Sequence, residues 1–275
     1  MLSPFEEIVV DLAPLELPGD VIDRLPRRWE KLGDVLLMKI DDIIIPHAEE
    51  VLPVYARVLR AKAVLRDLGI QGRLREPMVE LLHGERTETV HRENGVLFHM
   101  DPAVVMFSSG NIDERKRMAT VGTPGETVVD MFAGIGYFIL PMAVHTQVRG
   151  MAFELNPASH AFLERNIEAN GVSDSIEPVL GDCMDSPEGT ADRVVMGYFD
   201  DTEMYLEKAM RMISPSGGVV HAHSVCPEEL LSTRPDAEAA NAAVAADRTI
   251  VSSDLRRVKS YAPGVDHIVL DIEIE

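Results

Sequence analysis

Residues 128–138 constrain the fold of this chain more than any other segment, and they read VVDMFAGIGYF. A short β-branched run ends at Asp130, and a tight turn with Gly134 and Gly136 leads into an apolar segment of helical character. Glycines carry no Cβ, so a ligand can lie against their backbone, and the start of a helix offers unpaired N–H groups. The segment predicts a strand, a turn and a helix that bind a nucleotide-type ligand.

The residues around this turn distinguish between nucleotide-type ligands. A dinucleotide fingerprint has a third glycine three residues after the second, but Ile139 occupies that position. Acids instead follow three successive strand-like runs, at Asp130, Glu154 and Asp182, and an acid at the tip of the second strand can accept both ribose hydroxyls. This pattern is typical of S-adenosylmethionine enzymes and disfavours NAD. The alternative, in which the acids only cap strand ends and helices, stays open.

Composition sets the outer limits. The 275 residues fit one large or two small domains, and a hydrophobic content of 46% is ample for a buried core. No apolar run approaches the roughly 20 residues that a membrane span needs, and the first residues lack the basic region of a secretory signal. We therefore expect a cytoplasmic protein without a membrane anchor. Cys183 and Cys226 have no partner at metal-ligand spacing, so we expect neither a disulfide framework nor a metal site.

The net charge of −20 disfavours a nucleic-acid partner, because phosphate binding depends on Lys and Arg. Three basic clusters nevertheless stand out from the acidic background. They are candidate phosphate-binding surfaces, and the alternative that they are ordinary solvated faces stays open. The first cluster comprises Arg24, Arg27, Arg28 and Lys31, the second Arg115, Lys116 and Arg117, and the third Arg256, Arg257 and Lys259.

Residues 1–100 have the mixed pattern of a small α+β module. An apolar strand-like run spans residues 34–45, and residues 48–68 have the apolar spacing of a helix that Gly69 and Gly72 would end. Short antiparallel strands joined by an Asn-Gly turn are expected at residues 79–82, 87–92 and 96–100.

Strands and helices alternate regularly from Asn111 onward, within the second expected domain, residues 101–275. The alternation predicts an α/β fold with a doubly wound, mainly parallel sheet, and the last two strands fit an antiparallel hairpin at its edge. We therefore expect a Rossmann-like catalytic domain after the smaller N-terminal α+β domain. Strands are expected at residues 127–132, 147–154, 176–180, 193–198, 218–225, 250–259 and 265–274, and helices from residue 111 and at 137–145, 157–169, 202–213 and 236–246.

Six segments carry a family resemblance. They are residues 25–30 (LPRRWE), 33–37 (GDVLL), 87–95 (TETVHRENG), 106–115 (MFSSGNIDER), 129–136 (VDMFAGIG) and 259–265 (KSYAPGV). Together, and in this order, they resemble the archaeal tRNA guanine-37 N1-methyltransferases and the related wybutosine-synthesis aminocarboxypropyltransferases, which have the class I S-adenosylmethionine-dependent methyltransferase fold. The similarity covers most of the chain.

One segment separates the two branches of this family. Methyltransferases carry an Asn-Pro-Pro or Asn-Leu-Pro turn after the fourth strand, whereas residues 195–199 here read VMGYF. That turn and the later residues His221 and His223 resemble the aminocarboxypropyltransferase branch, although Asp266 stands where that branch usually has Trp. We favour the aminocarboxypropyltransferase. A tRNA guanine-37 N1-methyltransferase and a non-catalytic RNA-binding relative remain the alternatives.

The resemblance implies a transferase of the EC 2.5.1 type. Its reaction would move the 3-amino-3-carboxypropyl group of S-adenosylmethionine to 4-demethylwyosine at position 37 of phenylalanine tRNA, in wybutosine biosynthesis, and release methylthioadenosine. The acceptor carbon must lose a proton, so a base can assist. The implied partner is the anticodon loop of that tRNA, with the N-terminal module as the part that contacts it, and no protein partner is implied.

The resemblance also assigns cofactor contacts by matching positions. Ser108 and Arg115 match contacts of the family, and an Arg suits the methionine carboxylate because it forms a bidentate fork. Glu154 is expected to hold the ribose, and Asp182 and the backbone of Cys183 to face the adenine. No catalytic base and no metal ligand are assigned. The full expected cofactor site is Ser108, Arg115, Asp130, Gly134, Gly136, Glu154, Asp182 and Cys183.

A few further residues keep two interpretations. His221 and His223 lie two apart on an expected strand and so share a face; they are either buried, hydrogen-bonded histidines or a base or RNA contact. Tyr198 either stacks on a flipped base or belongs to the core. Ser108 has the second role of a helix cap. Trp29 is expected to pack within the small module.

Overall fold

The computed structural model describes residues 2–72, 75–199 and 202–275. The chain forms two compact units, Met1–Ser109 and Gly110–Glu275. Near the end of the first unit, Phe107 packs edge-on against Phe98 and His91, with ring centroids 5.6 and 5.1 Å away.

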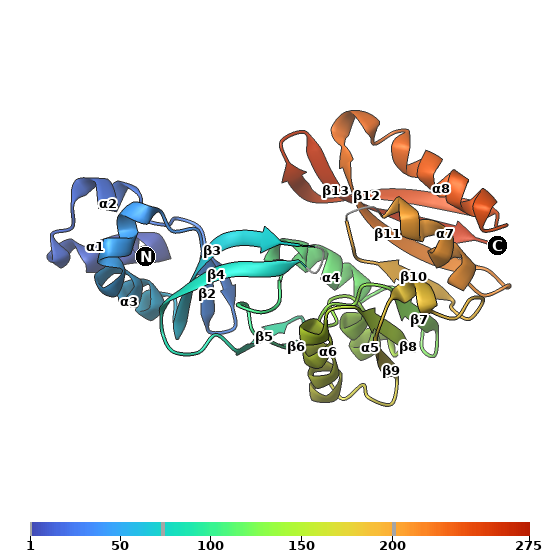
Figure 1. Ribbon diagram of the computed structural model, residues 1–275, viewed down its shortest axis with the longest axis horizontal. Helices are drawn as coiled ribbons and strands as arrows, with labels where there is room; N and C mark the ends of the chain where they lie inside the picture. The colour runs from blue at the N-terminus through green and yellow to red at the C-terminus, as the bar shows by residue number, and fades with distance from the viewer. Residues whose placement is uncertain (1, 73–74, 200–201) are drawn as a thin grey trace. The chain divides into compact units, whose positions relative to one another are not determined.

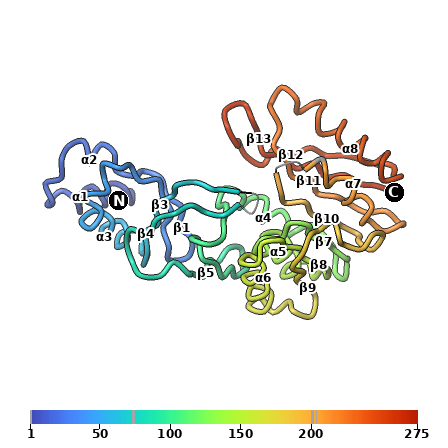
Figure 2. Tube along the Cα trace, in the orientation of Figure 1, coloured from blue at the N-terminus to red at the C-terminus, as the bar shows by residue number. Residues whose placement is uncertain are grey.

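The first unit combines a four-stranded sheet with α-helices that gather near the N-terminus (Figure 2). Its elements are α1 (Pro4–Leu12), η1 (Ala13–Leu15), α2 (Gly19–Asp23), β1 (Glu30–Leu32), β2 (Val35–Met38), η2 (Asp42–His47), α3 (Ala48–Val58), β3 (Ala63–Gln71) and β4 (Glu76–His83). The strand order is β1-β2-β3-β4, with β2 and β3 parallel and the outer pairs antiparallel. Ile8 of α1, Leu36 of β2, and Leu52 and Tyr55 of α3 are fully buried in one apolar core.

The strand predicted over residues 34–45 is wrong in its second half. Strand β2 ends at Met38, and η2 follows after a short connection. Asp41 caps this 3₁₀ helix, since its Oδ1 accepts a hydrogen bond from Ile43 N at 3.2 Å. A short Asp side chain competes with a sheet ladder in this way. Ile44 therefore enters the core from a helical turn and not from a strand.

The helix predicted over residues 48–68 is also wrong in its second half. Helix α3 ends at Val58, and Arg60 takes a left-handed φ of 54°, which a right-handed helix does not continue through. The chain then pairs along β2 as β3, so Gly69 lies within a strand, Gly72 follows it, and neither ends a helix. Apolar spacing over so short a stretch fits both a helix and a strand, and pairing with the neighbouring strand β2 decides that a strand forms.

The predicted hairpin that follows is confirmed. Strands β5 (Thr89–Glu93) and β6 (Val96–Met100) pair antiparallel. Asn94 and Gly95 connect them with φ values of 48° and 80°, the left-handed pair that a two-residue hairpin turn requires. Thr89 Oγ1 donates a 2.6 Å hydrogen bond to Asp34 Oδ1, which attaches the hairpin to the four-stranded sheet.

The second unit contains a seven-stranded sheet of order β12-β13-β11-β10-β7-β8-β9. Its strands are β7 (Thr127–Asp130), β8 (Arg149–Glu154), β9 (Ile176–Leu180), β10 (Arg193–Met196), β11 (Gly218–Pro227), β12 (Ile250–Ala262) and β13 (Val265–Ile274). Every pairing is parallel except the two that involve β13. The predicted α/β class, the mainly parallel sheet and the antiparallel edge hairpin are confirmed.

Helices cover both faces of this sheet (Figure 1). The helices are α4 (Ile112–Met118), α5 (Ile139–Thr146), α6 (Pro157–Ala169), α7 (Glu203–Met212) and α8 (Arg234–Ala245), with short 3₁₀ turns η3 (Ser109–Asn111), η4 (Cys183–Asp185) and η5 (Glu228–Leu230). On one face, α7 and α8 bury Leu206 and Ala239 in an apolar core that includes Val220 and Leu270. Side chains alternate along a strand, so His221, next to Val220, points to the opposite face, where α4 lies.

Candidate functional site

The glycine turn between β7 and α5 holds Glu154 at the end of the neighbouring strand. Gly134 N donates a 2.8 Å hydrogen bond to Glu154 Oε2, and Asn156 N donates to Oε1 at 2.7 Å. Burial outweighs these bonds and keeps the pKa of the Glu154 carboxyl above its ordinary value. Gly134 and Gly136 have left-handed φ values of 58° and 101°, and a Cβ on Gly134 would lie 2.2 Å from the Tyr137 ring. The turn therefore requires glycine for its own geometry, and its amide orients Glu154.

Asp130 ends β7 and is completely buried. Its Oδ1 accepts a hydrogen bond from Phe132 N at 3.2 Å, whereas its Oδ2 has no hydrogen-bond partner among the described residues. Burial, reinforced by the charge of Glu154, raises the pKa of the Asp130 carboxyl to about 7. A buried carboxylate oxygen without a donor is costly. Asp130 therefore has the capacity to accept a hydrogen bond from a ligand.

Asp182 and Cys183 follow β9, one strand further along the sheet. Asp182 caps η4, since its Oδ1 accepts a hydrogen bond from Met184 N at 3.0 Å. Cys183 is buried, and burial raises the pKa of its thiol to about 12, so it is a neutral thiol near pH 7. The carboxyl ends of β7, β8 and β9 thus carry Asp130, Glu154 and Asp182 side by side, as their spacing predicts.

Arg115 lies on the buried face of α4, with only 2% of its surface exposed. Asn111, Glu114 and Met118 share this face at helical spacing. A guanidinium with so little exposure needs polar partners. Ser108 lies in the first unit, where it is half-buried directly before η3, and its contact with a cofactor stays a prediction.

The segment after β10 contributes to an aromatic cluster. Tyr198 stacks on Phe132, with ring centroids 5.1 Å apart and planes 23° from parallel, and Tyr205 meets Phe132 edge-on. Gly197 allows Phe138 to approach this segment, because a Cβ there would lie 2.9 Å from the Phe138 ring. Tyr198 therefore packs within the unit while staying only partly buried, and its stacking on a base stays a prediction.

His221 and His223 project from one face of β11, and both are buried, hydrogen-bonded histidines. Arg193 donates to His221 Nε2 at 2.6 Å, so the Nδ1 of His221 carries the proton and donates to Asp271 Oδ1 at 2.5 Å. His223 Nδ1 lies 3.1 Å from His267 Nε2. Burial lowers the pKa of His223 and His267 to about 3, so both are neutral near pH 7. No local sequence signal marks His267 or Asp271 as partners of these histidines, because only the pairing of β11 with β13 brings them together.

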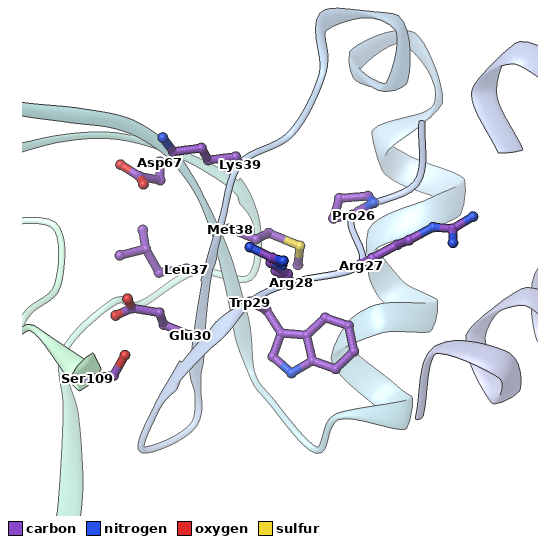
Figure 3. A pocket seen from close by; sticks show the side chains of 10 residues that line it. All are labelled: Pro26, Arg27, Arg28, Trp29, Glu30, Leu37, Met38, Lys39, Asp67 and Ser109. Atoms are coloured by element: carbon purple, nitrogen blue, oxygen red, sulfur yellow. The ribbon is translucent and has the colours of Figure 1, made fainter. Parts of the chain in front are cut away.

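The first basic cluster borders a groove of about 910 Å³ in the first unit (Figure 3). Arg27, Arg28 and Lys39 are exposed along it, and no described carboxylate pairs with any of the three. Trp29 also lines the groove and meets Tyr55 edge-on, with centroids 6.3 Å apart, so the predicted packing of Trp29 is confirmed. The other lining residues are Pro26, Glu30, Leu37, Met38, Asp67 and Ser109.

Several other residues of the three basic clusters are engaged within the chain. Their charged groups already have a carboxylate or carbonyl partner, so they are weaker candidates for phosphate binding than the groove. The contacts are Arg24 with Asp41, Lys31 with the Leu59 carbonyl, Lys116 with Asp113, Arg117 with Glu114 and Asp271, Arg256 with Asp254, and Arg257 with Asp266.

Residues 2–72, 75–199 and 202–275 contain no group of three His, Cys, Asp or Glu side chains that could hold a metal ion. In the same part of the chain, no helix has the length and apolar character needed to cross a bilayer. Cys183 and Cys226 are both buried free thiols.

Comparison with known proteins finds relatives over nearly the whole chain. Residues 89–251 match the TRM5/TYW2 methyltransferase domain, and residues 10–87 match the TYW2 N-terminal domain. A relative from Pyrococcus horikoshii is named tRNA(Phe) (4-demethylwyosine(37)-C(7)) aminocarboxypropyltransferase. It is 40% identical over 260 residues, which cover 94% of this chain and 93% of the relative.

Solved structures that share the fold include two TYW2 proteins. The P. horikoshii TYW2 structure, in complex with MeSAdo, is 38% identical and matches 97% of this chain and 97% of its own with a TM-score of 0.86. The M. jannaschii TYW2 structure, in complex with AdoMet, is 34% identical and matches 90% of this chain and 99% of its own with a TM-score of 0.76. The chain therefore belongs to the TRM5/TYW2 methyltransferase family, in the branch of the TYW2 aminocarboxypropyltransferases.

Proposed function

We propose that the protein transfers the 3-amino-3-carboxypropyl group of S-adenosylmethionine to 4-demethylwyosine at position 37 of tRNA-Phe and releases methylthioadenosine. One observation carries this conclusion: 94% of the chain aligns, at 40% identity, with a relative named for that reaction. The chain also has the glycine turn and the three strand-end acids that suit the co-substrate. The chain lacks the Asn-Pro-Pro or Asn-Leu-Pro turn of the methyltransferases, since residues 195–199 contain neither Asn nor Pro. This disfavours the methyltransferase alternative.

The described residues fit S-adenosylmethionine as co-substrate. Glu154 is held by two amides at a strand tip, where its carboxylate suits the two ribose hydroxyls. Asp130 has a buried oxygen without a donor, and three neighbouring carboxylates suit a ligand with a positive sulfur and a positive amine. We assign the ribose to Glu154, the adenine edge to Asp182 and the Cys183 backbone, and the methionine carboxylate to Arg115.

S-adenosylmethionine supplies a sulfonium that activates all three attached carbons. The protein decides which carbon reacts by which one it holds in line with the nucleophile. Glu154 and Asp182 hold the nucleoside in this assignment, and Arg115 holds the far end of the amino-acid arm. The chain between these anchors is then fixed, and its γ-carbon is the one presented to the acceptor. No covalent bond to the protein is required.

We assign the tRNA contact of the first unit to the groove of Arg27, Arg28 and Lys39. A chain of net charge −20 repels RNA as a whole, so binding needs a local surface whose cations are not already neutralised. These three cations meet that condition, and Trp29 adds an aromatic surface beside them. Arg24, the other arginine of the cluster, pairs with Asp41 and is a weaker candidate for this role.

The reaction is tested by incubating the protein with unmodified and 4-demethylwyosine-containing tRNA-Phe. S-adenosylmethionine is supplied in two forms, labelled either in the carboxypropyl portion or in the methyl group. We expect carboxypropyl label, and no methyl label, in the tRNA that carries 4-demethylwyosine. Methyl label at guanosine 37 would establish the methyltransferase instead.

The groove is tested by the salt dependence of tRNA binding. Replacing Arg27, Arg28 and Lys39 by Gln should lower affinity and flatten the plot of log K against log salt by about one unit per lost phosphate contact. The matched control replaces Arg24 and Arg57, which are ion-paired with Asp41 and Asp11. An unchanged slope in the groove variant would show that these three cations do not contact phosphate and are ordinary solvated surface charges.

A further inference from the structure

A chain of buried polar side chains crosses the face of the seven-stranded sheet opposite α7 and α8. It begins beside the amino end of β7 and reaches helix α4 through β10, β11 and β13. Each of its side chains is at most 19% exposed. The links are Glu126 to Arg193 at 2.7 Å, Arg193 to His221 at 2.6 Å, His221 to Asp271 at 2.5 Å, Asp271 to Arg117 at 2.7 Å, and Arg117 to Glu114 at 2.6 Å.

Arg117 links helix α4 to strand β13, and all three nitrogens of its guanidinium donate hydrogen bonds. Its Nη1 and Nη2 donate to the two carboxylate oxygens of Asp271 at 2.7 and 3.2 Å. Its Nε and Nη2 donate to Glu114 at 2.9 and 2.6 Å. A planar fork with five donors can hold two carboxylates in this way, and a lysine ammonium cannot. The contact therefore sets the orientation of α4 as well as its distance from the sheet.

Helix α4 depends on such contacts for its position. It has seven residues, and helices this short do not persist on their own because nucleation is unfavourable. Its buried face carries Glu114, Arg115 and Met118, so Arg115 is the direct neighbour of the residue that Arg117 binds. A rotation of α4 that released Arg117 would turn the Arg115 side chain by the same angle.

We propose that Arg117 and Asp271 are positioning residues that aim Arg115 at the carboxylate of the aminocarboxypropyl arm. The inference rests on the proposed function, because it takes Arg115 as the residue that binds this carboxylate. Asp271 fits the role because its other contact, with His221, ties it to β11 and through Arg193 to β10. The arm of the co-substrate is thereby fixed relative to the strands that hold its nucleoside.

The test compares two ligands that differ in the arm. S-adenosylhomocysteine carries the carboxylate, whereas methylthioadenosine lacks it, and neither reacts. In Arg117→Lys and in Asp271→Asn, calorimetry should show affinity for S-adenosylhomocysteine reduced by about 10-fold to 100-fold, the scale of a lost charge-assisted contact. Affinity for methylthioadenosine should change by less than about 2-fold. A simple loss of folded protein would weaken both ligands equally.

Two further variants separate the inference from the function on which it rests. Arg256→Gln is the matched control, because Arg256 also approaches Asp271, at 3.3 Å, but is half-exposed; its ligand ratio should match that of the wild type. Arg115→Gln should lose S-adenosylhomocysteine selectively. If Arg115→Gln is selective while Arg117→Lys and Asp271→Asn are not, the positioning role is wrong and the Arg115 assignment stands. If Arg115→Gln is not selective, both are wrong.

Discussion

Arg257 Nη2 lies 2.7 Å from Oδ1 of Asp266, and Asp266 is 1% exposed near the tip of the β12–β13 hairpin. The contact does not meet hydrogen-bond geometry, so it is an ion pair and not a bidentate hydrogen bond. The buried charge of Asp266 therefore depends on its partner, Arg257.

Arg257→Gln should therefore destabilise the second unit. The change leaves a buried carboxylate without its cation, and because Arg257 is half-exposed we expect a loss of about 1 to 2 kcal/mol in the free energy of unfolding. Denaturant unfolding measures the loss, and the double variant with Asp266→Asn should lose less than the sum of the two single changes. Lys116→Gln is the control, since Lys116 lies 3.9 Å from the exposed Asp113 and its removal should be nearly neutral. Equal losses in the two Gln variants would contradict the ion pair's importance.

Glu154→Gln should weaken the binding of both S-adenosylhomocysteine and methylthioadenosine by about 1 to 3 kcal/mol, because both ligands contain the ribose. This equal effect contrasts with the selective effect expected for Arg115. Glu164→Gln is the matched control, since Glu164 lies on α6 with its side chain largely exposed, 3.6 Å from His160. Calorimetry of the two variants with each of the two ligands checks the assignment. Unchanged affinity in Glu154→Gln would show that Glu154 does not bind the ribose.

Cofactor affinity should depend on pH through Asp130. Its pKa in the ligand-free protein is raised to about 7, and a ligand that donates to the buried carboxylate favours the ionised form. Binding then releases a proton below pH 7, so affinity for S-adenosylhomocysteine should rise by up to about 10-fold per unit as pH rises towards 7, and level off above it. Asp130→Asn should flatten this profile. A wild-type profile without a break near pH 7 would show that Asp130 does not meet the ligand as a carboxylate.

Acid should destabilise the second unit through His223 and His267. Burial lowers the pKa of both imidazoles from 6.5 to about 3, so the unfolded chain binds more protons than the folded protein between these values. Their contribution to stability is therefore fully present above pH 6.5 and is lost as pH falls towards 3, at up to about 1.4 kcal/mol per unit for each group. Urea unfolding from pH 7 to pH 4 measures the slope. The double variant His223→Asn with His267→Asn should have a smaller slope of stability against pH. The same slope in that variant would show that other groups cause the acid sensitivity.

Local sequence was sufficient for much of the second unit. The bounds expected for the helix at residues 157–169 and the strand at 176–180 agree with α6 and β9, and the glycine turn with its three strand-end acids lies where its spacing predicts. These features depend on short-range causes. Pro157 starts a helix behind the cap Asn156, a left-handed φ selects Gly134, and parallel strands bring their carboxyl ends to one edge.

Residues 59–71 show where local sequence was insufficient. Leu65 and Leu68 fit a helical period, yet β3 forms because β2 offers a partner for its backbone N–H and C=O groups. The partner lies more than twenty residues away in the sequence, so no local pattern reveals it.

Local residue patterns are enough to predict the family, the Rossmann-like sheet and the acids at its edge, because strand ends and glycine turns depend on neighbouring residues. Which charges are neutralised follows from the folded chain alone. It pairs Arg117 with Asp271 and Arg257 with Asp266, and it leaves Arg27 and Arg28 without a described carboxylate partner. The physical reason is that the interaction between two charges depends on their separation in space and on the dielectric around them, and neither can be read from their positions along the chain.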